Sequence, residues 1–202
     1  MIRPNIEYRS FLFYLFKFIF AYCVLYYGTL AIIGFSTPEG YHSNFVEKYL
    51  DYIEWLRSVL LRGSKLFLSL LGYKSNIDTT SVHIIRLTGG RGVRIVYSCI
   101  GYGVMSFWGA FVYANKGKWT KKIKWIIGGW IAICFINIGR ISLLLISINK
   151  GWAMPFNLDH HTLFNIAAYT LVFFMIYLFD RSGKKKNTID TNEADLKSRL
   201  VE

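Results

Sequence analysis

Long apolar runs constrain this chain more than any other feature of its sequence. A helix needs about 20 apolar residues to cross a hydrocarbon core of ~30 Å. Four segments approach or exceed that length while holding very few charged side chains, namely residues 11–35, 99–114, 123–148 and 162–179. We therefore predict an all-α integral membrane protein with four transmembrane helices.

The composition agrees with a membrane location. Hydrophobic residues make up 53% of the chain and charged residues 18%, which excludes an intrinsically disordered protein. The first apolar run is too long for the core of a signal peptide and lacks a small-x-small cleavage site, so we expect a retained first helix. Of the 3 cysteines, Cys23 and Cys134 lie inside apolar runs, which argues against a disulfide framework.

The basic residues orient the chain. The formal net charge of +12 would suggest nucleic-acid binding in a soluble protein, but here the basic residues flank the apolar runs. Residues 115–124 are rich in lysine. Basic residues also lie at the N-terminus and after the last span. The positive-inside rule therefore predicts cytoplasmic N- and C-termini at the inner (cytoplasmic) membrane. It places the more acidic residues 36–52 outside.

Residues 53–72 have a different pattern. Their charges, Glu54, Arg57, Arg62 and Lys65, fall on one side of a helix, and most of their apolar residues fall on the other. We predict an amphipathic helix at the membrane interface. The alternative is a transmembrane helix whose polar side packs within a bundle. The parity of four spans favours the first, because it requires that this helix does not cross.

A short extracytoplasmic β-hairpin is predicted over residues 75–98. Side chains alternate in its first half, a Gly-rich turn follows at residues 88–92, and a β-branched run then leads to Cys99. This pattern is typical of hairpins. We expect residues 1–180 to form a single membrane-embedded domain and residues 181–202 a disordered cytoplasmic tail.

Three residues that can carry chemistry are predicted to meet at the outer side of the membrane. Cys99 lies where the hairpin enters the next apolar segment, Arg140 lies in the outer half of its helix, and His161 lies at the outer start of the last helix. The lysine segment 115–124 makes its two neighbouring helices antiparallel. A nucleophile, a cation and a titratable base are therefore predicted to lie together at the outer ends of three helices.

Arg140 is the most informative of the three on energetic grounds. A charged side chain near the centre of a lone helix costs roughly 2.5–3.5 kcal/mol on insertion scales. Asn137 lies on nearly the same helix face one turn earlier, and a polar stripe in an apolar helix suggests an interior site. The alternative is an arginine that packs or snorkels toward the nearby boundary.

Cys99 and His161 each have an ordinary structural explanation as well. A lone cysteine is more often a small buried hydrophobe, although Cys99 lies at the predicted interface. His161 suits the start of a helix and shares a helix face with Asn165. Its neighbour His160 points about 100° away on a helix, so the two are poor joint metal ligands. We predict no metal and no organic cofactor.

These residues belong to three short motifs in a fixed order. The motifs are Tyr97-Ser98-Cys99-Ile100-Gly101, Asn137-Ile138-Gly139-Arg140 and His161-Thr162-Leu163-Phe164-Asn165. This order, with a hairpin before the cysteine and a lysine loop after it, resembles the exosortase/archaeosortase family. The resemblance covers roughly residues 75–180, and the short chain is typical of a divergent, compact bacterial branch.

The resemblance implies a cysteine transpeptidase or protease. Such enzymes recognise C-terminal sorting signals of exported proteins and cleave near a short motif at the outer face of the membrane. Cys99 would attack the scissile carbonyl and form a thioester, His161 would transfer the proton, and Arg140 would bind the developing oxyanion. Asn137 and Asn165 would orient the cation and the base.

His160 is the alternative to His161 as the catalytic histidine. The partners implied are the sorting-signal region of a secreted protein and the lipid bilayer. The acceptor would be water, an amine, or an envelope polysaccharide or lipid, and nucleic acid is excluded as a partner.

Two other functions fit the same sequence pattern. A non-catalytic multi-pass scaffold or accessory subunit for envelope polysaccharide or protein export has the same composition and topology. A membrane-embedded hydrolase differs only in using water as its acceptor. The scaffold would tolerate Cys99→Ser, Arg140→Lys and His161→Ala together, whereas the enzyme would not.

Overall fold

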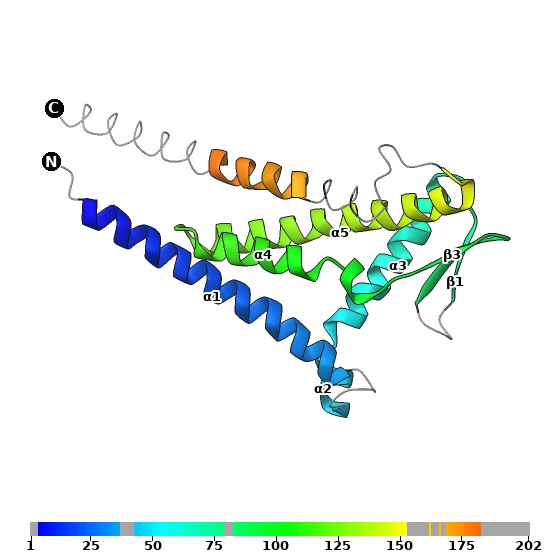
Figure 1. Cartoon of the computed structure of the whole chain (residues 1–202), viewed down its shortest axis with the longest axis horizontal. Helices are drawn as coiled ribbons and strands as arrows, with labels where there is room; N and C mark the ends of the chain where they lie inside the picture. The colour runs from blue at the N-terminus through cyan, green and yellow to red at the C-terminus, as the bar shows by residue number, and fades with distance from the viewer. Residues whose placement is uncertain are drawn as a thin grey trace. The chain divides into compact units, whose positions relative to one another are not determined.

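The computed structural model describes most of the chain, namely residues 4–36, 43–78, 83–152, 162, 166 and 169–182. The chain forms two compact units, residues 1–158 and 159–202, and each is considered by itself. The described part of the first unit consists of helices, one 3₁₀ turn and a small sheet (Figure 1). In the second unit, the described residues are helical.

Two helices of the first unit are long and apolar enough to cross a membrane. These are α1 (Pro4–Ser36) and α5 (Trp119–Lys150). They contain the predicted spans 11–35 and 123–148, which are thereby confirmed as helices. Within the described ranges no other helix meets the same requirements of length and hydropathy. The described residues therefore support two of the four predicted spans.

The predicted span 99–114 is broken at its start. A 3₁₀ turn, η1 (Tyr97–Cys99), comes first, and Gly101 then adopts a φ of +82°, so that α4 is confined to Tyr102–Ala114. The 13 residues of α4 extend about 20 Å at 1.5 Å per residue, which is less than the ~30 Å hydrocarbon core. The prediction of one continuous helix over this segment is therefore wrong, because a turn that carries Cys99 interrupts it.

α4 and α5 pack closely because α5 has a glycine, Gly129, at the point of contact. Trp108 of α4 is fully buried, and its indole N–H donates to the Trp125 carbonyl at 2.9 Å. A Cβ atom on Gly129 of α5 would overlap the indole nitrogen. Only a residue without a side chain lets the tryptophan approach the α5 backbone in this way.

α1 has one packed side and one exposed side. It contacts α4 through aromatic pairs, with ring centroids 5.4 Å apart for Phe18–Phe107 and for Tyr26–Tyr102. Many of its other large apolar side chains are exposed, among them Phe13, Phe16, Phe20, Val24 and Tyr27. An apolar exposed face of this kind is expected where lipid rather than water is the solvent.

The helix predicted over residues 53–72 is present as α3 (Tyr52–Leu70), preceded by the short helix α2 (Asn44–Tyr49). The carboxylate of Asp51 caps α3 by accepting the Glu54 N–H at 3.0 Å. α3 packs against α5 and the sheet. The existence of the helix is confirmed, while its location at the membrane interface stays a prediction.

The two faces of α3 match the predicted ones only in part. Arg57, Leu61 and Leu68 lie on the predicted polar side, yet all three are buried against the protein. Leu66 and Leu70 lie on the predicted apolar side and are 63% and 77% exposed. The other residues follow the prediction, because Arg62 and Lys65 on the polar side are exposed and Ile53, Leu56 and Leu60 on the apolar side are buried. The predicted faces are therefore right in part, and both the interfacial helix and the alternative of a helix packed by its polar side stay predictions.

The predicted hairpin is part of a three-stranded antiparallel sheet. Its strands are β1 (Ser75–Asp78), β2 (Ile84–Leu87) and β3 (Gly92–Arg94), in that spatial order. The hairpin of β2 and β3 agrees with the prediction, and β1 adds a strand that alternation did not indicate. Ile85 is fully buried in a core shared with α3 and α5, so the sheet is fastened to the helices through its inner face.

One asparagine ties the hairpin turn to α5. Asn149 accepts the Arg91 N–H at 2.6 Å and donates to the Arg91 carbonyl at 3.1 Å. Its amide also donates to the carbonyl of Leu145 in its own helix at 2.8 Å. A Cβ on Gly90 would overlap the asparagine side chain. The turn therefore cannot shift without breaking both hydrogen bonds.

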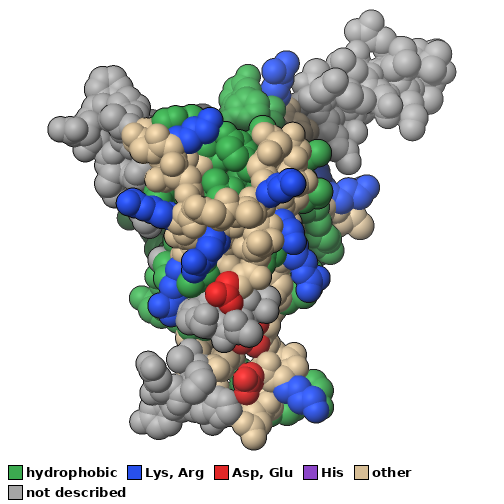
Figure 2. Space-filling view, turned by 90° about the vertical axis from the view of Figure 1, so that its right-hand side faces the viewer, with side chains coloured by type: hydrophobic (Ala, Val, Ile, Leu, Met, Phe, Trp, Pro, Cys, Tyr) green, Lys and Arg blue, Asp and Glu red, His purple; other side chains and the backbone are tan. Residues whose placement is uncertain are grey.

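The outer surface of the sheet is basic. Figure 2 shows this end of the first unit, where Lys and Arg side chains are spread over the surface. The exposed cations contributed by the sheet and its turns are Lys74, Arg86, Arg91 and Arg94. Asp78 of β1 adds one negative charge to the sheet, and residues 79–158 contain no Asp or Glu.

Candidate active site

Cys99 lies on a turn rather than within a helix. Its N–H donates to the Val96 carbonyl at 2.9 Å, and the Ile100 N–H donates to the Tyr97 carbonyl at 3.2 Å. Ile100 is fully buried and anchors the turn in the core. The Cys99 thiol is free and half-buried at the edge of that core. A thiol in this position is held firmly at its backbone and still open on one side.

Asn137 of α5 holds the end of the same turn. Its amide nitrogen donates to the Ile100 carbonyl at 2.9 Å, and the residue is 5% exposed. A Cβ on Gly101 would lie 2.5 Å from that nitrogen. The glycine is thus needed both for its positive φ and for the space that the asparagine occupies. The sequence predicts that Asn137 orients Arg140, whereas its hydrogen bond is to the backbone beside Cys99.

Arg140 follows Asn137 by one helical turn on α5 and is half-buried. Within the described ranges, it has neither a hydrogen bond nor an ion pair with another side chain. A half-buried guanidinium without a carboxylate partner keeps its positive charge available to an anionic group. α5 therefore presents, on neighbouring turns, a backbone-binding asparagine and a cation that has no ion-pair partner among the described residues.

The histidine of the predicted site lies outside the described residues. This applies to His161, to its alternative His160 and to Asn165. The described structure thus joins the Cys99 turn to the Asn137–Arg140 face of α5. It leaves the position of the base as a prediction.

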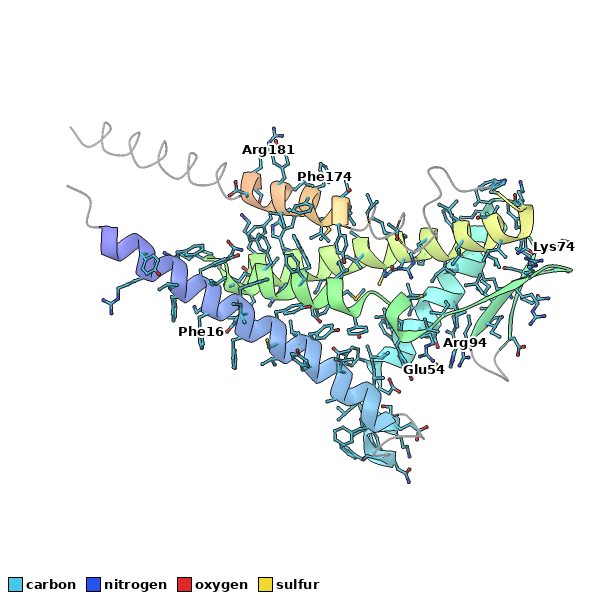
Figure 3. The ribbon with its side chains drawn as sticks, viewed as in Figure 1. Phe16, Glu54, Lys74, Arg94, Phe174 and Arg181 are labelled. Atoms are coloured by element: carbon cyan, nitrogen blue, oxygen red, sulfur yellow. The ribbon has the colours of Figure 1, made fainter. Side chains whose placement is uncertain are left out.

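A second group of polar side chains, which the sequence did not indicate, lies beside the turn. Arg57 of α3 is 7% exposed, and its guanidinium carbon lies 4.2 Å from the centroid of the Tyr97 ring. Its Nη1 contacts His83 Nδ1 at 2.9 Å and Glu54 Oε2 at 3.1 Å. His83 Nε2 contacts Oε1 of the same glutamate. We call Glu54, Arg57, His83 and Tyr97 the arginine cluster (Figure 3 labels Glu54).

Sequence reasoning missed the arginine cluster for two reasons. It assigned Glu54 and Arg57 to a solvent-facing side of the helix, and it gave His83 no partner. One signal was present, because Ile53, Arg57 and Leu60 share the i, i+4, i+7 spacing of a buried stripe. The pairing with His83 depends on how the sheet packs on α3, which spacing does not report.

An apolar cavity lies next to these elements. It has a volume of about 770 Å³ and is lined by side chains of α1, α3, α4 and α5. Tyr102 and Met105 of α4, one to two turns past Cys99, and Ile138, next to Asn137, are among the lining residues. A cavity of this lining accepts hydrocarbon rather than a charged group.

Metal ligands do not gather in the part of the chain that the structure covers. None of its described residues form a group of three or more His, Cys, Asp or Glu side chains suited to an ion.

The fold and the turn together define a helical membrane protein with a half-buried cysteine held beside an asparagine–arginine face. The family model for the transmembrane exosortase (Exosortase_EpsH) matches residues 11–178. The chain therefore belongs to the transmembrane exosortase family, which confirms the resemblance in the sequence. Members of this family are cysteine transpeptidases that process sorting signals within a membrane. No curated protein and no solved structure matches the chain.

Proposed function

We propose that this protein is a membrane-embedded cysteine transpeptidase or protease that cleaves C-terminal sorting signals of exported proteins through a thioester on Cys99. One observation supports it most directly. The only cysteine outside the apolar helices stands on a turn that α5 holds through Asn137, one helical turn from Arg140, which has no ion-pair partner among the described residues.

The reaction divides between three side chains. The Cys99 thiolate attacks the scissile carbonyl, and the carbonyl π electrons move to oxygen, where Arg140 stabilises the negative charge. Collapse of this intermediate breaks the C–N bond, and His161 gives a proton to the leaving amine. His161 then takes a proton from the acceptor, which attacks the thioester and returns the thiolate.

The membrane sets the geometry of the substrate. We propose cytoplasmic termini at the inner membrane and a site that faces outside, where an exported protein is reached while its hydrophobic tail is still in the bilayer. Water, an amine, or an envelope polysaccharide or lipid serves as the acceptor. The exposed cations Lys74, Arg86, Arg91 and Arg94 suit an acceptor that carries negative charge.

The experiment is to look for the thioester itself. Membranes from cells that express the wild type are treated with hydroxylamine, which cleaves thioesters, and peptides released from the enzyme are identified by mass spectrometry. We expect peptides from near the C-termini of exported proteins with the wild type and none with Cys99→Ala. Arg140→Met should reduce their yield, because the oxyanion loses its cation.

Two outcomes would contradict the proposal. One is the same release of peptides from Cys99→Ala as from the wild type. The other is a triple variant with Cys99→Ser, Arg140→Lys and His161→Ala that supports sorting at the wild-type level, which would identify a non-catalytic scaffold instead.

A further inference from the structure

The arginine cluster has a defined hydrogen-bonding order. A guanidinium can only donate, so His83 Nδ1 accepts from Arg57. The ring proton must then lie on Nε2, which contacts the Glu54 carboxylate. Glu54 therefore receives donors from both the histidine and the arginine. The three side chains form a closed set that fixes the plane of the guanidinium.

The cluster is poorly explained as a source of stability. A buried ion pair loses much of its attraction to the cost of removing both charges from water. In addition, Arg57 Nε is buried without a hydrogen-bond partner among the described residues. His83 has a φ of +50°, and it is the only described residue other than glycine with a positive φ. Strained and unsatisfied groups of this kind gather where function requires them.

The position of the cluster suggests what it does. Arg57 stacks on Tyr97, the first residue of η1, and Asn137 binds the carbonyl that follows the last residue of η1. The turn is thus held at its start by α3 and at its end by α5. Between these two contacts, Cys99 remains half-buried and free.

We propose that Arg57, fixed by Glu54 and His83, is a positioning residue that holds Tyr97 and thereby the orientation of the Cys99 thiol. The arginine acts through the aromatic ring and does not touch the substrate. The inference rests on the proposed function for the use of that orientation in catalysis, but not for the orientation itself.

The mobility of a spin label on Cys99 reports how firmly the turn holds this position. The full-length protein, with Cys23→Ser and Cys134→Ser, is labelled at Cys99 with a nitroxide thiosulfonate and reconstituted in phospholipid vesicles. We expect an immobilised spectrum for the parent protein. Arg57→Met, which keeps length and removes the charge and the planar fork, should lose the immobilised component. Arg57→Lys should restore part of it.

The aromatic ring provides matched variants. Tyr97→Phe keeps the ring and should keep the immobilised spectrum, whereas Tyr97→Leu should lose that component as Arg57→Met does. The double variant Arg57→Met/Tyr97→Leu should be no more mobile than either single one, because both remove the same contact. Arg62→Met is the control, since Arg62 is an exposed arginine on the same helix.

Several results would overturn the inference. An immobilised spectrum in folded Arg57→Met, or equal mobility in Arg57→Met and Arg62→Met, would show that the arginine does not position the turn. If Arg57→Met fails to fold, the Tyr97→Phe and Tyr97→Leu variants test the same contact while Glu54, Arg57 and His83 are unchanged. Equal spectra for these two variants would also overturn the inference.

A parallel assay separates this inference from the proposed function. The hydroxylamine-released peptides are counted over time for the unlabelled variants, where Arg57→Met should slow formation of the thioester without weakening substrate binding. If the parent protein forms no thioester while the label still responds to Arg57→Met, the proposed function fails and the positioning role stands.

Discussion

At the scale of single residues, the site depends on how Asn137 of α5 fits against Gly101, which precedes α4. Gly101 has a positive φ and no side chain, and Asn137 fills the space that a Cβ would need. The hydrogen bond to Ile100 follows from that contact. The thiol is therefore placed by backbone geometry rather than by its own packing.

We expect Gly101→Ala to destabilise the protein by about 1–3 kcal/mol, because alanine is strained at this φ and its Cβ displaces the asparagine. Thermal unfolding in detergent measures the effect. Gly139→Ala is the control, since a Cβ there meets nothing within 4 Å and alanine is the better helix former by up to about 1 kcal/mol. Equal stability of the two variants would contradict the account of the turn.

Asn137→Leu should also destabilise the fold by about 1–3 kcal/mol, because the buried Ile100 carbonyl loses its donor. Leucine has a similar size, so the loss is one of hydrogen bonding rather than volume. The same unfolding assay, combined with the rate of Cys99 alkylation, checks the prediction. A variant that unfolds and alkylates like the wild type would show that the hydrogen bond does not hold the turn.

At the scale of elements, apolar runs and alternation were enough to predict α1, α5 and the β2–β3 hairpin. These patterns are local, and the physical forces behind them act over a few neighbouring residues. The break before α4 was not predictable in this way, because it depends on Asn137, which is far along the chain from Gly101. Arg57, Leu61 and Leu68 of α3 were misassigned for a related reason. Periodicity locates a polar side of the helix, but it does not report which of its residues the rest of the fold buries.

Close packing of α4 on α5 should depend on Gly129 and not on the adjacent Gly128. Gly129→Ala places a methyl group against the Trp108 indole and should cost about 1–3 kcal/mol through overpacking. Gly128→Ala adds the same methyl group where nothing lies within 4 Å, so it should be neutral or stabilising. Denaturant unfolding of the two variants in detergent checks this, and the reverse order would refute the packing.

The location of α3 can be tested from its two ends. Trp55 and Leu70 lie near opposite ends and are 68% and 77% exposed. If α3 lies at the outer interface, an impermeant maleimide should reach Trp55→Cys and Leu70→Cys from outside intact spheroplasts. Labelling of one of them only after permeabilisation would show that α3 crosses the membrane.

At the scale of the whole molecule, two groups of basic residues bear on the predicted topology. Lysines crowd residues 115–124, and the sheet that precedes Cys99 carries several arginines. The positive-inside rule is applied here to the first group, while the second lies on the predicted extracytoplasmic hairpin. The predicted topology therefore depends on which basic group remains cytoplasmic.

Single cysteines at the two basic groups test that topology. In a background without the native cysteines, Arg91→Cys should react with an impermeant maleimide in intact spheroplasts. Lys116→Cys should react only after permeabilisation, because the positive-inside rule predicts a cytoplasmic loop there. The opposite pattern would place the Cys99 turn on the cytoplasmic side, where exported substrates are not yet available.

The double hydrogen bond of Asn149 to the hairpin turn has a mechanical consequence. A helix whose apolar length does not match the bilayer adjusts its tilt, and α5, with 32 residues, is longer than the ~30 Å core requires. Because Asn149 holds the hairpin and Asn137 holds the cysteine turn, both travel with α5 when it tilts. The protein thereby keeps the arrangement of the hairpin and the cysteine turn in membranes of different thickness, and under the proposed function it would meet its substrate at a changed depth with an unchanged arrangement of groups.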